Sequence, residues 1–255
     1  MEQKKRTSLQ TLPTVLGNEA IANPADSPLW KKSAIFIGDS ICHNKYEQLQ
    51  DPTTAGWPGR IGTKYEMRWY NTGVGGATVA VTKENNTTVQ LIKIKETVEE
   101  IDLLVMQGGI NDAYGGVALG RVEEGFQLDS FDNTTFAGCL QNLFARAKSY
   151  YPEAKFFYIL HHTTPSSLML TDLNQRNIPR GNPKDYIDLA CEICEKWGVP
   201  YLNLYDDEKF NVEIFDTAHN SKGCMWPDLL HLGSPLGYDT LTSYIVAWLE
   251  HCLKQ

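Results

Sequence analysis

The chain has 255 residues and carries 23 Lys and Arg against 31 Asp and Glu, which gives a formal net charge of −8 at pH 7. This acidic balance argues against a nucleic-acid-binding protein, which needs a basic surface to neutralise phosphates. Hydrophobic residues make up 42% of the sequence and aromatic residues 11%, a composition that excludes a generally disordered chain.

The sequence predicts a cytoplasmic protein with reduced thiols. Its longest apolar run, Tyr244–Leu249, is far shorter than the roughly 20 residues that cross a bilayer. The basic residues 4–6 are followed by polar residues and proline rather than by the apolar segment of a secretory signal. Six cysteines are too few for a disulfide scaffold of this size.

Apolar runs and helical spacing alternate along the chain. Residues 1–32 are polar and contain three prolines, which predicts an irregular lead-in before a single domain over residues 33–255. Strands followed by helices predict parallel βαβ units with right-handed crossovers, and therefore a three-layer α/β/α sandwich around a five-stranded parallel sheet. The predicted strands are Ala34–Ile37, Met67–Tyr70, Leu103–Met106, Phe156–Leu160 and Val199–Leu204, and the predicted helices are Val89–Val98, Phe136–Ala147, Tyr186–Trp197 and Leu236–Leu253.

Parallel sheets of this kind bind ligands beyond the carboxyl ends of their strands, so the residues after each strand are candidates for a site. Ser40 follows the first strand in Gly38-Asp39-Ser40. A hydroxyl at a strand-to-helix turn is exposed above a helix N-terminus, which favours developing negative charge. A simple helix cap is the alternative interpretation.

The second strand is followed by the glycine-rich segment 71–78. Glycines let backbone N–H groups approach a ligand closely. A dinucleotide-binding loop is excluded because Thr78 stands where its third glycine is required, and a tight turn remains an alternative.

Two further segments supply polar side chains. Asn111 follows the third strand and can aim its amide at the point reached by Ser40 and a glycine N–H, which would form an oxyanion hole. Asp228 and His231 lie three residues apart before the last helix. The carboxylate can orient the imidazole while its other nitrogen removes the Ser40 proton; in isolation, a structural loop histidine is the simpler interpretation.

The order of these four blocks resembles the SGNH hydrolase family, also called the GDSL esterase/lipase family, from about Pro28 to the C-terminal helix. The resemblance implies a flavodoxin-like sandwich and a serine mechanism that needs no metal or organic cofactor. It further implies that Ser40 is the nucleophile, His231 the general base and acid, and Asp228 its partner. The oxyanion hole would consist of the Ser40 N–H, the Gly76 N–H and the Asn111 side chain.

The sequence departs from the family pattern in two blocks. Ile41 stands where the first block usually has leucine, a conservative change. Gly75 and Ala77 flank Gly76, where the family commonly has serine and aspartate, so either Gly75 or Gly76 could supply the oxyanion N–H. Asp39 and Asp112 belong to the same motifs and are interpreted as local scaffolds that cap turns or tie loops together.

Histidines and cysteines outside the four blocks have simpler interpretations. Cys191 and Cys194 form a Cys-x-x-Cys, but they lie inside a predicted helix without a second pair, which favours two helix thiols over a zinc or redox site. His161 and His162 follow the fourth strand, and His162 is a candidate substrate contact. Structural histidines are the alternative, and metal binding is disfavoured because neighbouring strand residues face opposite ways.

Three aromatic residues, Trp57, Tyr114 and Trp226, lie next to the motifs and are candidates for the wall of a substrate pocket, with core packing as the alternative. The segments 113–133 and 163–182 are longer than usual connections, and we expect them to determine substrate choice.

The first hypothesis is a serine esterase that hydrolyses a small carboxylic ester through an acyl-enzyme. A short-acyl or O-acetyl ester, which can be carried on a carbohydrate, is preferred because the sequence shows no apolar lid segment. A lysophospholipase or an acyl thioesterase is the alternative within the same chemistry, and a non-catalytic binding module on the same fold is the alternative of another class. Activity should fall at acid pH, with a midpoint at roughly pH 6 to 7, because His231 must be neutral to accept a proton. The oligomeric state stays open.

Overall fold

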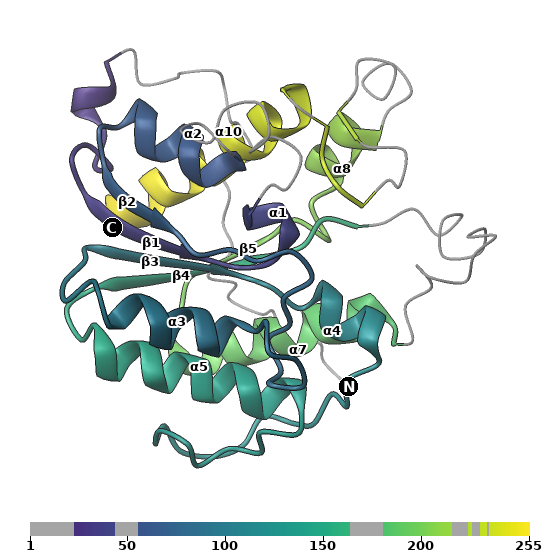
Figure 1. Cartoon of the computed structure of the whole chain (residues 1–255). Coiled ribbons are helices and arrows are strands. Elements are labelled where there is room, and N and C mark those ends of the chain that lie inside the picture. Colours follow the sequence, from purple (N-terminus) through teal and green to yellow (C-terminus); the bar gives the residue numbers. More distant parts are fainter. Residues whose placement is uncertain (1–22, 44–55, 164–180, 216–223, 226–229, 234) are drawn as a thin grey trace.

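The computed structural model describes residues 23–43, 56–163, 181–215, 224–225, 230–233 and 235–255. At its centre lies a five-stranded sheet in the order β2-β1-β3-β4-β5, in which every neighbouring pair is parallel (Figure 1). This sheet confirms the predicted fold class. The strands are β1 (Ser33–Ile37), β2 (Arg68–Asn71), β3 (Leu103–Gln107), β4 (Lys155–Leu160) and β5 (Tyr201–Asn203).

Helices cover both faces of the sheet (Figure 1). One face carries α1 (Ser40–His43), α2 (Gly56–Lys64), α8 (Glu208–Phe215) and α10 (Leu236–Leu253). The other face carries α3 (Thr87–Lys95), α4 (Ile110–Gly115), α5 (Phe136–Tyr150) and α7 (Pro183–Trp197).

Strands β1 and β3 are buried along their whole length, as the apolar runs Ala34–Ile37 and Leu103–Met106 predict. Ile35 and Ile37 of β1 belong to the core beneath α3, α5 and α7, whereas Ala34 and Phe36 belong to the core beneath α2 and α10. This alternation follows from the two-residue period of a strand, which sends successive side chains to opposite faces. The three-layer sandwich therefore has two cores that share one sheet.

The short helix α1 and the helices α2, α4 and α8 have no counterpart among the predicted helix ranges. Helix α2 has the sequence GWPGRIGTK, whose glycines and proline are poor helix formers. Packing outweighs this propensity, because α2 buries Trp57 and Ile61 in the core beneath α10. A side chain at Gly62 would place its Cβ 2.2 Å from the Trp69 ring, so the close approach of α2 to β2 requires glycine there.

The described part of the lead-in is anchored to the rest of the chain. A short 3-10 helix, Pro24–Asp26, precedes Leu29, which is fully buried in the core beneath α10. The Ser27 hydroxyl donates a hydrogen bond of 2.6 Å to Glu250 Oε1 of α10. Residues 23–32 thus pack against the C-terminal helix.

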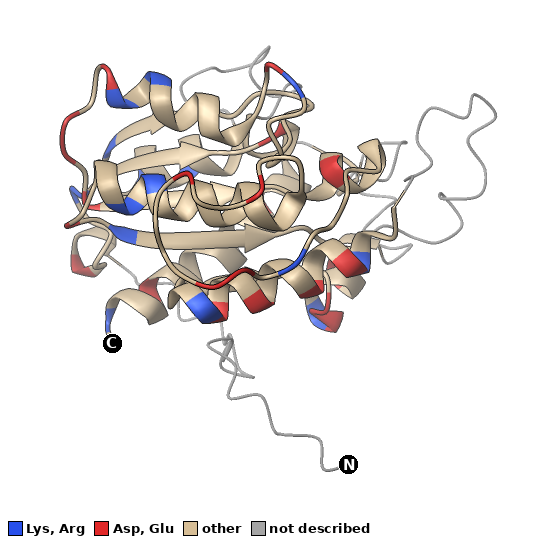
Figure 2. Ribbon diagram, turned by 90° about the horizontal axis from the view of Figure 1, so that it is seen from below, with Lys and Arg blue, Asp and Glu red and all other residues tan. Residues whose placement is uncertain are grey.

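Charged side chains of both signs lie on the face formed by α3, α5 and α7 (Figure 2). Within the described ranges, no helix is both long enough and apolar enough to cross a membrane.

Candidate active site

Ser40 begins α1 at the carboxyl edge of the sheet, three residues after Ile37 ends β1. The turn between them requires glycine at position 38, because a Cβ there would lie 2.7 Å from Cys42 Cβ and 3.1 Å from the Gln107 carbonyl oxygen. The chain therefore turns sharply into α1, and this turn places the Ser40 side chain at the edge where such sheets bind ligands.

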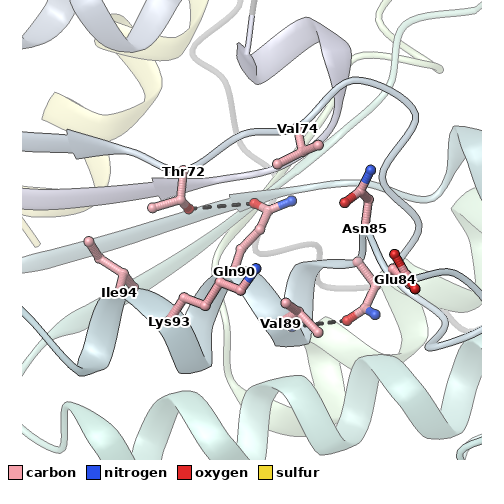
Figure 3. Close-up of a pocket in the computed structure, with 9 residues that line it drawn as sticks. Thr72, Val74, Glu84, Asn85, Val89, Gln90, Lys93 and Ile94 are labelled. Atoms are coloured by element: carbon pink, nitrogen blue, oxygen red, sulfur yellow. Dashed lines mark hydrogen bonds between the residues drawn. The ribbon is translucent and has the colours of Figure 1, made fainter.

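A buried glutamine holds this turn from the side of α3. The Gly38 N–H donates to Gln90 Oε1 at 3.0 Å, and Gln90 Nε2 donates to the Gly38 carbonyl oxygen at 2.8 Å. Figure 3 shows the Gln90 side chain reaching from α3 toward Thr72, which follows β2. The Val74 N–H also donates to the Gly38 carbonyl oxygen, at 3.0 Å. Nothing in the local sequence indicates this role for Gln90, since it lies 52 positions from Gly38 in a helical segment.

Ser40 and His231 meet across 191 positions of sequence. The Ser40 Oγ lies 2.8 Å from His231 Nε2, which is hydrogen-bond distance. The segment around His231 is held by backbone pairing, because the Gly233 N–H donates to the Cys224 carbonyl oxygen at 2.8 Å and Met225 forms an antiparallel bridge with Leu232. Asp228, the predicted partner of His231, and the predicted pocket residue Trp226 lie outside the described residues.

Two of the predicted oxyanion residues, Asn111 and Gly76, come from α4 and from the segment after β2. Asn111 lies in the first turn of α4, and its Nδ2 donates to the Ala77 carbonyl oxygen at 2.9 Å. This bond brings the Asn111 amide against the segment that carries Gly76. Gly76 has a φ of +76°, which favours glycine, and an added Cβ at Gly75 or Gly76 would meet no atom within 4 Å.

Asp112 of α4 is bonded to the same segment after β2, as its interpretation as a scaffold predicts. Its two carboxylate oxygens accept hydrogen bonds of 2.9 Å from the Val79 and Ala80 N–H groups. Burial raises the pKa of Asp112 to about 7, although these two N–H groups favour the carboxylate.

Asp39 faces a histidine beneath the turn formed by Gly38–Ser40. Its Oδ1 accepts a hydrogen bond of 2.9 Å from the Ile41 N–H, which caps α1, and its Oδ2 lies 3.6 Å from His161 Nε2. Both side chains are buried. Burial raises the pKa of Asp39 to about 6 and holds the pKa of His161 well below its ordinary value. His161 is therefore a neutral partner for a buried acid, a pairing that the sequence did not indicate.

The predicted substrate contacts occupy different environments. Trp57 is fully buried and packs edge to face against Phe36, with ring centroids 5.2 Å apart, which favours the alternative of core packing. His162 is only 2% exposed, and its Nε2 lies 3.1 Å from the Leu230 carbonyl oxygen. Tyr114 is partly exposed on α4, next to the turn that carries Asn111.

The two long segments expected to determine substrate choice differ in what the structure describes. The rings of Phe126 and Phe131 pack on Trp197, with centroids 4.9 and 6.0 Å away. Trp197 ends α7 just before β5 begins, so this part of the first segment lies away from the edge that carries Ser40. In the second segment, residues 164–180 lie outside the described part of the chain.

An open cavity of about 260 Å³ lies between the loop after β2 and α3 (Figure 3). Thr72, Val74, Asn85 and Gln90 are among the residues that line it. Gln90 also bonds Gly38, so this cavity lies next to the side chain that holds the turn before Ser40.

The described residues contain no group of three or more His, Cys, Asp or Glu side chains arranged to hold a metal ion. Cys191 and Cys194 are buried free thiols on α7, as the helical interpretation predicts. Burial raises the pKa of Cys191 to about 11, which keeps the thiol protonated at neutral pH.

Comparison with known proteins gives one family and several structural neighbours. The model of the GDSL-like lipase/acylhydrolase family matches residues 36–239. Sequence comparison detects no relative among curated proteins.

Solved structures share the fold at low sequence identity. A protein from Lactobacillus plantarum has a TM-score of 0.64 and 19% identity, with 87% of this chain and 98% of that chain covered. A protein named as a possible lipase from Chitinophaga pinensis has a TM-score of 0.60 and 16% identity, covering 88% and 98%. A carbohydrate acetylesterase from Sinorhizobium meliloti has a TM-score of 0.58 and 16% identity, covering 87% and 100%.

Proposed function

The chain belongs to the GDSL-like lipase/acylhydrolase family, and from this premise we propose that it is a serine ester hydrolase in which Ser40 forms an acyl-enzyme. The observation that carries the proposal is the distance of 2.8 Å between Ser40 Oγ and His231 Nε2. A hydroxyl within hydrogen-bond reach of an imidazole is the arrangement that activates a serine nucleophile.

In the first step, Ser40 Oγ attacks the ester carbonyl carbon while His231 Nε2 takes the hydroxyl proton. The carbonyl π electrons move onto oxygen and give a tetrahedral oxyanion. Collapse of this intermediate breaks the bond to the alcohol oxygen, which receives the proton from His231. Water then repeats the sequence on the acyl-enzyme, releasing the acid and restoring Ser40.

The oxyanion would be bound by the Ser40 N–H, the Gly76 N–H and the second N–H of the Asn111 amide. An amide nitrogen has two hydrogens, so donation to the Ala77 carbonyl oxygen orients Asn111 and leaves one N–H for the reaction. Donors fixed before the reaction stabilise the developing charge without reorganisation.

The proposal assigns Asp228 as the carboxylate that orients His231 through its Nδ1. This assignment rests on the spacing of three residues between Asp228 and His231 and on the family membership. The carboxylate would also stabilise the imidazolium that forms when His231 takes the proton.

We favour a short-acyl ester, such as an O-acetyl group on a carbohydrate, as the substrate. The structural neighbour named as a carbohydrate acetylesterase supports this class. The neighbour named as a possible lipase keeps longer acyl chains as the second candidate.

The nucleophile is tested with a fluorophosphonate probe that labels activated serines. We expect wild type to be labelled and Ser40→Ala to remain unlabelled. Ser130→Ala is the matched control, since the exposed Ser130 hydroxyl only donates to the Gln127 carbonyl oxygen. Equal labelling of wild type and Ser40→Ala would refute the assignment, and unlabelled wild type would favour a non-catalytic binding module.

The acyl class is tested with nitrophenyl esters of increasing chain length, acetylated sugars and acyl thioesters. We expect kcat/KM to be highest for acetyl and propionyl groups. A maximum at long chains would favour a lysophospholipase, and a maximum with thioesters would favour a thioesterase. Ser40→Ala, measured beside wild type on every substrate, identifies turnover that does not depend on the site.

A further inference from the structure

The chain places two histidines directly after β4, and they face different parts of the site. His161 faces Asp39, whereas His162 faces the segment that carries His231. The two ring centroids lie 6.0 Å apart, and the ring planes are inclined at 52° to each other. His162 is 2% exposed, and its ring lies near Phe210 and Phe215 of α8, with centroids 6.3 and 6.1 Å away.

One polar contact of His162 is with the main chain next to His231. Its Nε2 lies 3.1 Å from the carbonyl oxygen of Leu230, the residue immediately before His231. A carbonyl oxygen only accepts hydrogen bonds, so His162 Nε2 carries the hydrogen in this contact. Both the neutral Nε2–H tautomer and the charged ring can donate this bond, so it does not depend on protonation.

This bond restrains the peptide group that precedes His231. On the other side of His231, Leu232 pairs with Met225, and Gly233 pairs with Cys224. His231 therefore lies between a side-chain anchor at Leu230 and backbone anchors at residues 232 and 233. Rotation of the Leu230–His231 peptide would swing the imidazole away from Ser40 Oγ.

We propose that His162 is a positioning residue for His231, an inference that rests on the proposed function of the Ser40–His231 pair. Its bond to the Leu230 carbonyl oxygen keeps His231 Nε2 at the distance from Ser40 Oγ that proton transfer needs. This role replaces the direct substrate contact expected for His162, because a side chain with 2% exposure presents almost no surface to a ligand.

Two substitutions separate the hydrogen bond from the packing of the ring. His162→Gln keeps an N–H donor at about the reach of Nε2, whereas His162→Leu fills much of the same space without a donor. We expect kcat on nitrophenyl acetate to fall roughly 10- to 100-fold in His162→Leu, because a misplacement of about 1 Å costs up to about 100-fold. KM should stay within about twofold, and His162→Gln should keep at least about a fifth of the wild-type kcat.

Amide hydrogen exchange of residues 230–233 gives a readout that needs no turnover. Exchange should be faster in His162→Leu than in wild type and close to wild type in His162→Gln. If His162→Leu does not fold, His162→Met supplies a second variant without a donor.

Any one of three results would overturn the inference. The first is a wild-type kcat in His162→Leu, and the second is an equal loss of kcat in His162→Gln and His162→Leu. The third is unchanged amide exchange of residues 230–233 in His162→Leu. Wild type and Ser40→Ala are assayed in parallel. Absence of Ser40-dependent turnover in wild type would overturn the proposed function and this inference with it. Ser40-dependent turnover with indistinguishable His162 variants would overturn the inference alone.

Discussion

The site has two halves that are held in different ways. The Ser40 half comprises Gly38–Ser40, α4 and the segment after β2, and the His231 half comprises residues 224–225 and 230–233. The Ser40 half is fixed by buried side chains that reach across the fold, as Gln90 does to Gly38 and Asp112 does to Val79 and Ala80. Among its described contacts, the His231 half is held by backbone pairing within residues 224–233 and by the His162 bond to Leu230.

This difference separates the contributions of the two halves to folding and to catalysis. A buried polar group that loses its partner costs about 1–3 kcal/mol of stability, so changes in the Ser40 half should lower stability and activity together. The His231 half has fewer such groups among its described residues. Changes there should lower activity with a smaller effect on stability, which gives the two halves distinct experimental signatures.

The largest effect is expected at Asn111, which belongs to the Ser40 half but is only partly buried. Asn111→Ala removes a proposed oxyanion donor, and kcat should fall about 100- to 1000-fold. Thermal unfolding should change little, so this variant separates the two signatures within one half. Asn85→Ala, on an exposed neighbouring loop, is the control and should retain wild-type kcat. A kcat close to wild type in Asn111→Ala would remove Asn111 from the oxyanion hole.

Gln90→Met tests the stability of the Ser40 half directly. It leaves the buried Gly38 N–H without its partner, so the free energy of unfolding should fall by about 1–3 kcal/mol, and kcat should fall with it. Denaturant titration and steady-state kinetics measure the two effects.

Gln141→Met is the matched control for Gln90→Met. Gln141 is a fully buried glutamine of α5 whose hydrogen-bond partners are Ala137 and Lys196 rather than the turn at Gly38–Ser40. We expect it to lower stability and leave kcat unchanged. Equal activity losses in both variants would show that lost stability alone explains the Gln90 effect.

A smaller effect is expected at the glycines after β2. Gly76→Ala forces alanine into a left-handed conformation, which costs about 1–2 kcal/mol, and a shift of the Gly76 N–H should lower kcat about tenfold. Gly75→Ala meets neither a positive φ nor a steric clash and should stay within about twofold of wild type. A larger loss in Gly75→Ala would assign the oxyanion N–H to Gly75.

The smallest effect is expected in the pH dependence of stability. The pKa of Asp39 is raised by burial to about 6 in the folded state, above its ordinary value of 3.8, so the folded protein binds this proton more tightly than the unfolded chain does. The contribution of Asp39 to the free energy of unfolding is therefore lost as pH rises. Between roughly pH 5 and 7 this loss should be about 1 kcal/mol, which lowers Tm by about 2–4 °C.

Asp39→Asn removes this titration while keeping an oxygen for the Ile41 N–H. Calorimetry across that pH range measures the Tm of both proteins. The fall in the Tm of wild type relative to that of Asp39→Asn gives the contribution of the Asp39 proton. Parallel Tm curves for the two proteins would contradict a raised pKa of Asp39.

The sequence predicted the strands well because β1, β3 and β4 contain the buried apolar runs Ala34–Ile37, Leu103–Met106 and Phe157–Leu160. It did not predict α2, because the glycines and proline of this segment have low helix propensity. The helix is stabilised by the packing of Trp57 and Ile61 beneath α10. The sequence predicted Ser40 and His231, and the structure brings them together. The oxyanion and Asp228 assignments stay predictions.

The sequence by itself determined which polar residues follow each strand, and the backbone of a parallel sheet brings the carboxyl ends of its strands to one edge whatever the side chains elsewhere. Only the tertiary structure decided which groups support that chemistry. Gln90, His161 and His162 lie far along the chain from the residues they hold, and a hydrogen bond over such separations leaves no local pattern in the sequence. Strand periodicity and turn motifs are short-range, whereas the partners of buried polar groups are fixed by packing between distant segments.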